Sequence, residues 1–344
     1  MTRAWLGLGL MLALVPCAGA QRVRDAAGPA EARLMLENRD AVVHLRRRDG
    51  FDLIYRQPDA PLGVEASIDM RLVYDTQFAI DDVEEAVMEA VLERNWLRAG
   101  LTALAAIEPF IPFLDLPNNN GAFMAYETGT YLLRAARRLQ AVGDLNADAQ
   151  ARALLRSAAA IYTSLARATW FPQAEHADLL VARSLLFRGQ RAEARQHLES
   201  LAVPGPYDPA YGLYRLVSAE LLFEEGDPHE ALEESVRSVA FQNKDVTTFP
   251  DALLLSAATY EAIGELHRAR DARYEVVRLF PQTDWEDAAA IELDRMMAEA
   301  LTEEQEEVSA EIVFFGLQED MNQRVRDYLE QRAQRALPSE GEEP

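Results

Sequence analysis

The stretch Tyr260-Glu-Ala-Ile-Gly-Glu-Leu-His-Arg-Ala269, which runs on to Phe280-Pro281, decides the fold class of this chain. Gly264, inside it, allows a tight turn between two helices, because a residue without a side chain enters the left-handed backbone region freely. Ala269 is small enough for the second helix to lie close against the first. Pro281 ends that second helix, since proline lacks the amide hydrogen that the helical ladder needs. The stretch therefore predicts a pair of antiparallel helices.

The same spacing of a glycine and an alanine five residues later occurs twice more, at Gly189 with Ala194 and at Gly226 with Ala231. From Gly189 to Gly226 and on to Gly264 the intervals are 37 and 38 residues. This pattern resembles the tetratricopeptide repeat (TPR), a helix pair of about 34 residues that stacks on its neighbours. The surplus residues fall in loops between one pair and the next, at 203–207 and 242–246.

The resemblance is close over residues 173–297 and loose over 81–171. In the loose part, Gly143 closes a helix expected over 131–142, whose partner runs from about residue 147 to 169, and a first, divergent pair begins near Trp96. The resemblance implies a mainly α protein, with a TPR-like α-solenoid of antiparallel helix pairs over residues 80–300, preceded by a small antiparallel β module. An irregular all-α bundle with accidental glycine spacing is the alternative.

Residues 21–79 are predicted to hold the β module. The segments 42–48 and 51–56 flank Asp49-Gly50, which is typical of a two-residue type I′ hairpin turn, and 64–70 alternates as a third strand does. The residues expected to share one face across the turn are Val43, Leu45, Phe51, Leu53 and Tyr55. The preceding segment, 26–38, is expected to be a short helix or a mobile lead. Because three uncovered strands are marginal, we expect them to pack on the first helices or to pair by an edge with a partner.

Residues 1–20 have the three parts of a secretory signal peptide. Arg3 precedes an apolar run over 4–15, and Ala18-Gly-Ala20 supplies the small residues before a cleavage site at Gln21. The apolar run is shorter than a comfortable membrane span. We therefore expect a mature chain in the periplasm or secreted, without a transmembrane span. Leu14-Val-Pro-Cys17 resembles the acylation site of bacterial lipoproteins, so a lipid anchor on Cys17 is the alternative.

The chain has 34 basic and 57 acidic residues and a net charge of −23, which argues against general binding to nucleic acid or to an anionic membrane. Cys17 is its only cysteine, so we expect a mature chain that folds without disulfides. Arg46-Arg-Arg48 lies in the β module, whereas residues 301–344 form an acidic segment that we expect to be helical with a disordered end. Association of these two segments is one route to self-association.

The sequence shows no motif of catalysis or of cofactor binding. The five histidines are isolated, and no His or Cys pair has the spacing of a metal site. Neither a glycine-rich phosphate loop nor a nucleophile elbow occurs. The run Asn118-Asn-Asn-Gly121 is expected to be a turn between helices. We therefore expect no catalytic residues, no metal and no cofactor.

In a TPR array the first helix of each pair lines a concave groove. Counting back from each turn glycine places cations in the earlier repeats and anions in the later ones. The predicted partner-binding groove comprises Arg137, Gln140, His176, Arg183, Glu220, Phe223, Asp251 and Glu261. Such a bipolar groove suits an extended peptide or a partner helix. We expect its charges to be partly exposed, so that reversing Arg137 and Arg183 leaves the melting temperature nearly unchanged.

The function predicted from these features is that of an exported, non-enzymatic scaffold that binds another envelope protein or peptide. The resemblance extends at the level of the fold to bacterial envelope TPR proteins, which include the outer-membrane assembly lipoprotein and the periplasmic coordinator of the Tol-Pal system. Two alternatives stay open. One is an enzyme of cell-wall or envelope metabolism, or its accessory subunit, and the other is a self-assembling structural repeat. The strand at 64–70 is a competing partner site.

Overall fold

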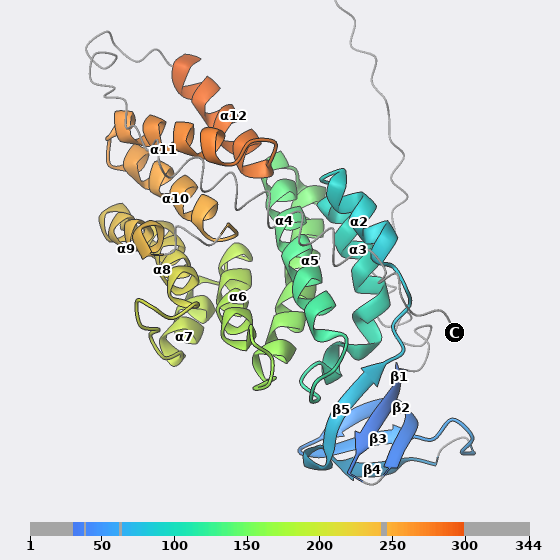
Figure 1. The fold of residues 1–344 in the computed structure, drawn as a ribbon. Helices are drawn as coiled ribbons and strands as arrows, with labels where there is room; N and C mark the ends of the chain where they lie inside the picture. Colours follow the sequence, from blue (N-terminus) through green and yellow to red (C-terminus); the bar gives the residue numbers. More distant parts are fainter. Residues whose placement is uncertain (1–29, 38, 62–63, 242–245, 299–344) are drawn as a thin grey trace, which may run out of the picture.

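The computed structural model describes residues 30–37, 39–61, 64–241 and 246–298. Over these residues the chain is mainly helical, with an antiparallel five-stranded sheet at its N-terminal end (Figure 1). The predicted signal peptide, the acylation motif and the acidic segment 301–344 lie outside the described residues. So do most of the residues in the predicted loop 242–246.

The sheet has the strand order β4-β3-β2-β1-β5. Its strands are β1 (Ala30–Leu36), β2 (Arg39–Asp49), β3 (Asp52–Arg56), β4 (Ala66–Asp69) and β5 (Val73–Phe78). The expectation of a helix or mobile lead over 26–38 is wrong for its described part, because β1 occupies it. Buried Ala32 and Leu34 alternate there with the exposed Glu31 and Arg33, which is the two-residue period of a strand. Ala, Glu, Arg and Leu favour helices locally, and pairing with both β2 and β5 overrides that preference.

The hairpin between β2 and β3 differs from its prediction by one residue. Asp49 pairs with Asp52, so the turn residues are Gly50, at φ +59°, and Phe51. Phe51 is 64% exposed and does not join the buried face, whereas Leu53 is fully buried. A β-bulge after Leu45 shifts the register and brings Leu53 opposite Arg48. The strand expected at 64–70 is present as the shorter β4, and β5 is an additional strand.

The helices follow the sheet and begin with α2 (Glu84–Leu92) and α3 (Trp96–Ile107). The later described residues form α4 (Ala122–Val142), α5 (Leu145–Ala166), α6 (Ala174–Phe187), α7 (Arg191–Ser200), α8 (Tyr211–Glu225), α9 (Pro228–Phe241), α10 (Phe249–Ala262), α11 (Leu266–Leu279) and α12 (Asp284–Ala298). Short 3-10 helices, η2 (Met70–Leu72) and η3 (Glu108–Phe113), precede β5 and follow α3. The helix predicted to begin at Tyr131 therefore starts nine residues earlier, at Ala122.

The predicted turn glycines join the helix pairs as expected. Gly189 and Gly226 have φ of +77° and +87°, values that side chains disfavour. The alanines five residues later, including Ala194 and Ala269, are buried between helices. Each of α6, α8 and α10 packs against its own partner and also against the first helix of the next pair. The helix-pair prediction is thus confirmed for residues 174–279.

The asparagine run before α4 attaches the sheet to the helices. Asn120 accepts a hydrogen bond from the Phe78 amide (2.7 Å) and donates one to the Phe78 carbonyl oxygen (3.1 Å). Asn119 is buried and donates to the carbonyl oxygens of Leu114 and Leu116. The run lies in a turn before a helix, as predicted, and it also fixes the end of β5.

The last described helix packs back toward the beginning of the helical region (Figure 1). Trp96, at the start of α3, donates its indole N–H to Asp284 of α12, and Arg94 pairs with Asp287 at 2.9 Å. Arg138 of α4 binds the same Asp284 carboxylate. The helices therefore form a closed arrangement in which α12 meets α3 and α4. We call this set of contacts the closing contact.

Candidate functional site

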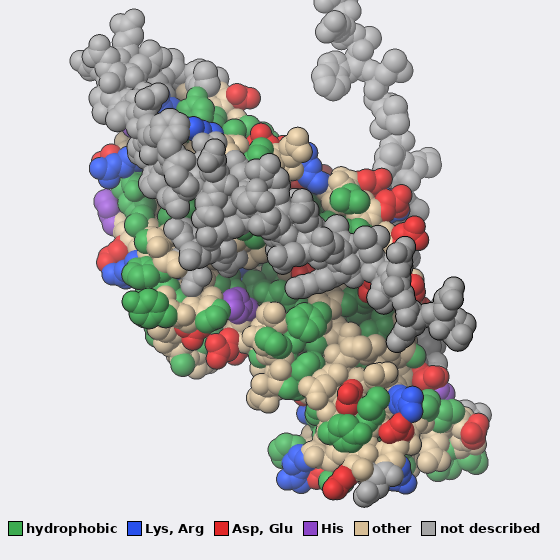
Figure 2. All heavy atoms as spheres, viewed as in Figure 1, with side chains coloured by type: hydrophobic (Ala, Val, Ile, Leu, Met, Phe, Trp, Pro, Cys, Tyr) green, Lys and Arg blue, Asp and Glu red, His purple; other side chains and the backbone are tan. Residues whose placement is uncertain are grey.

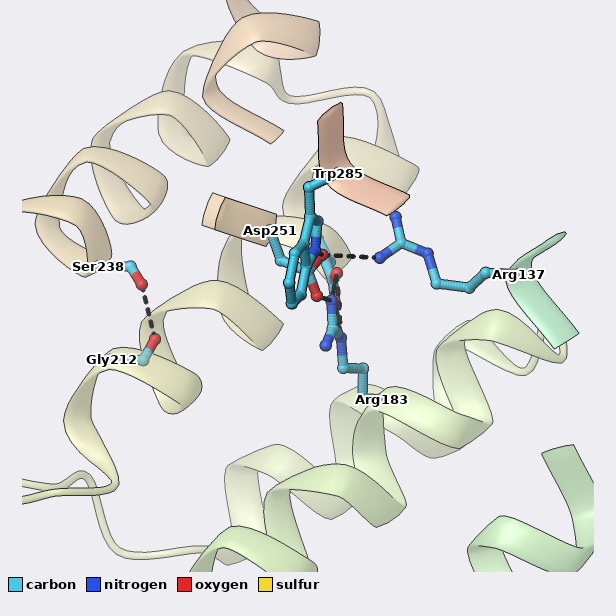
Figure 3. Close-up of polar contacts among 7 residues, drawn as sticks. Arg137, Arg183, Gly212, Ser238, Asp251 and Trp285 are labelled. Atoms are coloured by element: carbon cyan, nitrogen blue, oxygen red, sulfur yellow. Dashed lines mark hydrogen bonds and ion pairs between the residues drawn. The ribbon is translucent and has the colours of Figure 1, made fainter. Parts of the chain in front are cut away.

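Four helices each bring one of the predicted groove charges to a single ionic cluster, part of which Figure 3 shows. Arg183 of α6 binds both oxygens of Glu220 of α8, with its Nε 2.9 Å from Oε2 and its Nη2 2.6 Å from Oε1. The same Nη2 lies 2.7 Å from Asp251 Oδ2 of α10. Arg137 of α4 reaches the other oxygen of Asp251 at 3.1 Å. Trp285 of α12 donates its indole N–H to that oxygen at 2.8 Å.

Three of the four charged side chains in this ionic cluster are buried, and the fourth, Arg137, is 45% exposed, as expected for a groove residue. Arg183 and Glu220 are each 8% exposed, and the Asp251 side chain is 10% exposed. Burial alone would raise the pKa of Asp251, but the positive charges of Arg183 and Arg137 outweigh it and hold that pKa well below its usual range. Burial alone would lower the pKa of Arg183, and Glu220 and Asp251 reverse the direction and raise it. Asp251 and Arg183 therefore stay ionised at neutral pH.

The expectation of an exposed bipolar groove, with cations and anions in separate halves, is therefore wrong for Arg183, Glu220 and Asp251, which bind one another. Arg183 and Glu220 are 37 residues apart, the same interval as the turn glycines, so they occupy equivalent positions on adjacent helices. Opposite charges at equivalent positions of packed helices fall within contact distance and bind each other. Their hydrogen-bonding capacity is used inside the molecule.

The other predicted groove residues have separate environments. Gln140 donates to the Phe187 carbonyl oxygen at 2.8 Å. Glu261 accepts from the buried Arg273 and from Arg295, so it also lies outside the ionic cluster and is paired. His176 on α6 and Phe223 on α8 are half-buried and take no part in the cluster. The predicted groove thus splits into an ionic cluster, buried except for Arg137, and a few other accessible positions.

Sequence reasoning missed the aromatic part of the closing contact. The guanidinium of Arg134 lies between two indole rings, 4.7 Å from the Trp96 centroid and 4.5 Å from the Trp285 centroid. Such cation–π contacts strengthen as water is excluded. Trp285 connects the closing contact to Asp251 in the ionic cluster. These residues are far apart in the sequence, and no local pattern marks them.

A pocket of about 350 Å³ opens on the sheet. Its apolar lining includes Leu34, Leu36, Ala41, Val42, Val43, Tyr55 and Ile68, and Arg39, Asp40 and the segment 57–59 form its polar edge. The pocket belongs to the β module and lies outside the predicted groove. In the sequence, this pocket was indicated only by the alternation of apolar residues over 64–70, a segment that includes the lining residue Ile68.

Titratable side chains outside the ionic cluster also have shifted pKa values, among them His197 and Glu275. His197 lies 2.8 Å from Asp178, and this hydrogen bond raises the pKa of His197. Burial raises the pKa of Glu275. In the part of the chain that the structure describes, no group of three His, Cys, Asp or Glu side chains is placed to hold a metal ion. Among the described helices none is long and apolar enough to cross a membrane.

A comparison with models of known protein families finds no match, and a search of curated proteins finds no similar sequence. The resemblance to the TPR therefore rests on the glycine, alanine and proline positions of this chain and on the helix pairs that they punctuate.

Proposed function

We propose that this chain is an exported, non-enzymatic scaffold that binds another protein or peptide of the bacterial envelope. The observation that carries the proposal is the succession of helix pairs from α4 to α11, in which α4, α6, α8 and α10 contact one another in order. We interpret this succession as a TPR-like α-solenoid. Arrays of this kind present extended surfaces to other proteins.

The ionic cluster supports a structural role in preference to a catalytic one. A general acid or base needs a pKa near the working pH and an approach to substrate. The carboxylate of Asp251 has a pKa held far below that range, and both its oxygens are engaged by Arg137, Arg183 and Trp285. The cluster therefore holds four helices and α12 in fixed relation. An enzyme or accessory subunit of envelope metabolism would need a different site.

Export is proposed from the sequence alone, on the signal peptide expected over residues 1–20. A periplasmic or secreted location agrees with the single cysteine, Cys17, which falls within the expected signal. A lipid anchor on that cysteine is the alternative. N-terminal analysis of the protein from the envelope fraction decides between them. A start at Gln21 supports plain secretion, and an acylated Cys17 would overturn it.

Two surfaces are available to the proposed partner. One is the accessible remainder of the predicted groove, with Phe223 on α8 as its apolar member. The other is the β module, which projects from the helical region (Figures 1 and 2). Figure 2 shows apolar side chains and charges of both signs beside one another on the exposed β module. A self-assembling repeat, the third possibility, is opposed by the net charge of −23 on every copy.

Photocrosslinking in living cells tests the scaffold proposal. A benzophenone amino acid is placed at Phe223, at Ser67 on β4, and at the exposed Ala192 of α7 as a matched control. The scaffold proposal predicts a discrete protein adduct from Phe223 or Ser67, or from both, and none from Ala192. If neither binding position gives an adduct while the protein is present at its normal level, the proposal is contradicted.

A further inference from the structure

The face of the sheet that points toward the helices, which we call the inner face, is covered by described residues at one end only. At the covered end, Phe78 stacks on Phe110 with their ring centroids 4.7 Å apart, and Arg48 pairs with Asp115. The hairpin between β1 and β2 lies at the opposite end of β1, because Leu36 pairs with Arg39 there. At that end the inner face opens into the pocket of about 350 Å³.

The pocket has room for at least one large apolar side chain, and its floor is apolar. Its floor includes the fully buried Val43 and the nearly buried Leu34, and Ala41 leaves space between them. Tyr55 and Ile68 line the side that faces β4. Burying a Leu or Phe side chain in such a place contributes about 1.5–3 kcal/mol.

The two edges of the sheet differ in a way that exposes β4. On the β5 side, Asn118 donates to the Tyr74 carbonyl oxygen at 2.9 Å, and Asn120 engages both the N–H and the carbonyl oxygen of Phe78. These side chains bind outward backbone groups at both ends of β5. Within the described ranges, no strand pairs with the outer edge of β4.

The register shows which backbone groups of β4 point outward. Met70 donates to the Phe51 carbonyl oxygen at 2.9 Å, so this position belongs to the hydrogen-bonded pairs of β3 and β4. Hydrogen-bonded and non-hydrogen-bonded pairs alternate along antiparallel strands. The N–H and C=O groups of Ile68 therefore face β3, and those of Ser67 and Asp69 face away from the sheet. A further strand matches such a row of donors and acceptors.

We propose that the outer edge of β4 and the adjoining pocket form one recognition site, which binds an extended segment of a partner protein as an added strand. The backbone of this segment pairs with Ser67 and Asp69, and one of its apolar side chains enters the pocket beside Ile68. The inference deepens the proposed scaffold function and rests on it. It assigns recognition to the β module, and the helices serve as its support.

Charge selects a partner protein over a second copy of this chain. A second copy would bring another net charge of −23 to the same edge, which opposes close pairing. A strand from another protein that carries neutral or basic residues beside its apolar anchor avoids this repulsion.

Binding of a labelled peptide panel to the purified full chain tests this site. Each peptide has the sequence Lys-Thr-Val-Thr-X-Thr-Val-Lys, with Ala, Leu, Phe or Asp as X, and fluorescence anisotropy reports its binding. We expect Leu or Phe to bind most tightly and Asp at least about tenfold more weakly. A Leu peptide with alternate backbone amides methylated should also lose at least about tenfold, because it cannot complete the ladder. Equal binding of all four sequences, or of the methylated peptide, would overturn the proposal.

Two pairs of variants locate the site. Ser67→Pro removes an outward amide, whereas Ser67→Thr keeps it, and proline is tolerated at sheet edges. Ala41→Phe fills the pocket, whereas Ala192→Phe makes the same change at an exposed position of α7, away from the sheet. We expect the first member of each pair to weaken Leu-peptide binding at least about tenfold and the second less than about twofold. The melting temperature and far-ultraviolet circular dichroism verify that each variant is folded. Unchanged binding by folded Ser67→Pro and Ala41→Phe contradicts the site.

The crosslinking experiment separates failure of this inference from failure of the scaffold proposal. A protein adduct from Phe223 with none from Ser67 would leave the scaffold in place and overturn the β4 site. No adduct from either position would contradict the scaffold itself. An adduct from Ser67 that proves to be a second copy of this chain would assign the edge to self-association and overturn the partner proposed here.

Discussion

Trp96 and Asp284 are 188 residues apart in the sequence, and a hydrogen bond from the indole N–H to the carboxylate joins them. This bond belongs to the closing contact, in which Arg138 binds the same carboxylate and Arg134 lies between two tryptophan rings. The closing contact therefore places α12 against α3 and α4. The helical region is therefore closed by contacts of α3 and α4 with its last described helix, α12, which also contacts the ionic cluster through Trp285.

Trp96→Phe tests the closing contact by removing the indole N–H while keeping an aromatic ring beside Arg134. A hydrogen bond to a charged partner contributes about 1.5–3 kcal/mol, and we expect a loss near the lower value because the site is partly exposed. Hydrogen exchange of residues 284–298 should become faster than in the unchanged protein. Trp170→Phe, which loses a longer bond of 3.3 Å to a carbonyl oxygen, is the control. Equal exchange of α12 in both variants would mean that the closing contact does not hold it.

Asp251→Asn tests the buried ionic cluster. Removing one charge leaves Arg183 incompletely neutralised in a buried place, which destabilises by about 3–5 kcal/mol. Arg191→Ala, which breaks an ion pair whose side chains are 53% and 48% exposed, should lose less than about 1 kcal/mol. Urea unfolding measures both free energies. Equal losses would restore the original expectation that the groove charges contribute little to stability.

The pH dependence of the ionic cluster follows from the depressed pKa of Asp251. A carboxylate whose folded pKa lies below its ordinary value of 3.8 contributes stability above that value and loses it as the pH falls. We expect acid unfolding of the unchanged protein to include this loss and the curve of Asp251→Asn to lack it. The two unfolding free energies should therefore converge at low pH. A constant difference between them down to about pH 3 would contradict the assignment.

Ala269→Leu tests the close approach of α10 and α11. Ala269 is fully buried, so the added carbons overpack the interface and destabilise by about 1–3 kcal/mol. Ala192→Leu makes the same change on the exposed side of α7 and should stay within about half a kcal/mol of the unchanged protein. Thermal unfolding compares the two. Equal melting temperatures of the two variants would contradict our assignment of the interface between α10 and α11.

His197→Gln tests a pH-dependent contact between α6 and α7. Asp178 raises the pKa of His197 above its ordinary value of 6.5, so the pair adds stability below that value and loses it as the pH rises through the raised pKa. The contribution should be below about 1 kcal/mol because both side chains are partly exposed. The unchanged protein should therefore lose more stability between about pH 6 and about pH 9 than either His197→Gln or Asp178→Asn. Parallel pH curves for all three proteins would exclude the contact.

The helix pairs were predictable because their determinants are local. A glycine such as Gly226 is needed where the backbone turns left-handed, and small residues such as Ala269 are needed where helices touch. The meeting of Arg183 with Glu220 was predictable from the repeat interval, but its burial was not. Burial depends on how tightly the first helices pack and on Trp285 of α12, which covers the cluster from the end of the described chain.

The remaining features depend on contacts between distant segments. β1 consists of residues that favour helices and is a strand only because β2 and β5 flank it. The pocket arises where residues of four strands face one another, so no single strand shows it. The closing contact likewise joins residues of α3, α4 and α12, so no single helix shows it. Periodicity reports which face of an element is apolar, and it does not report which other element covers that face.

Hydrogen exchange of the full chain with and without the Leu peptide tests the central claim most directly, because it reports every part of the protein at once. The account predicts slower exchange at the outward amides of Ser67 and Asp69 and around the pocket at Ala41, with little change in α6, α8 and α10. Ser67→Thr should show the same protection, and Ser67→Pro should show none. Protection confined to the first helices of the repeats, with the β4 edge unaffected, would contradict the account and return recognition to the groove.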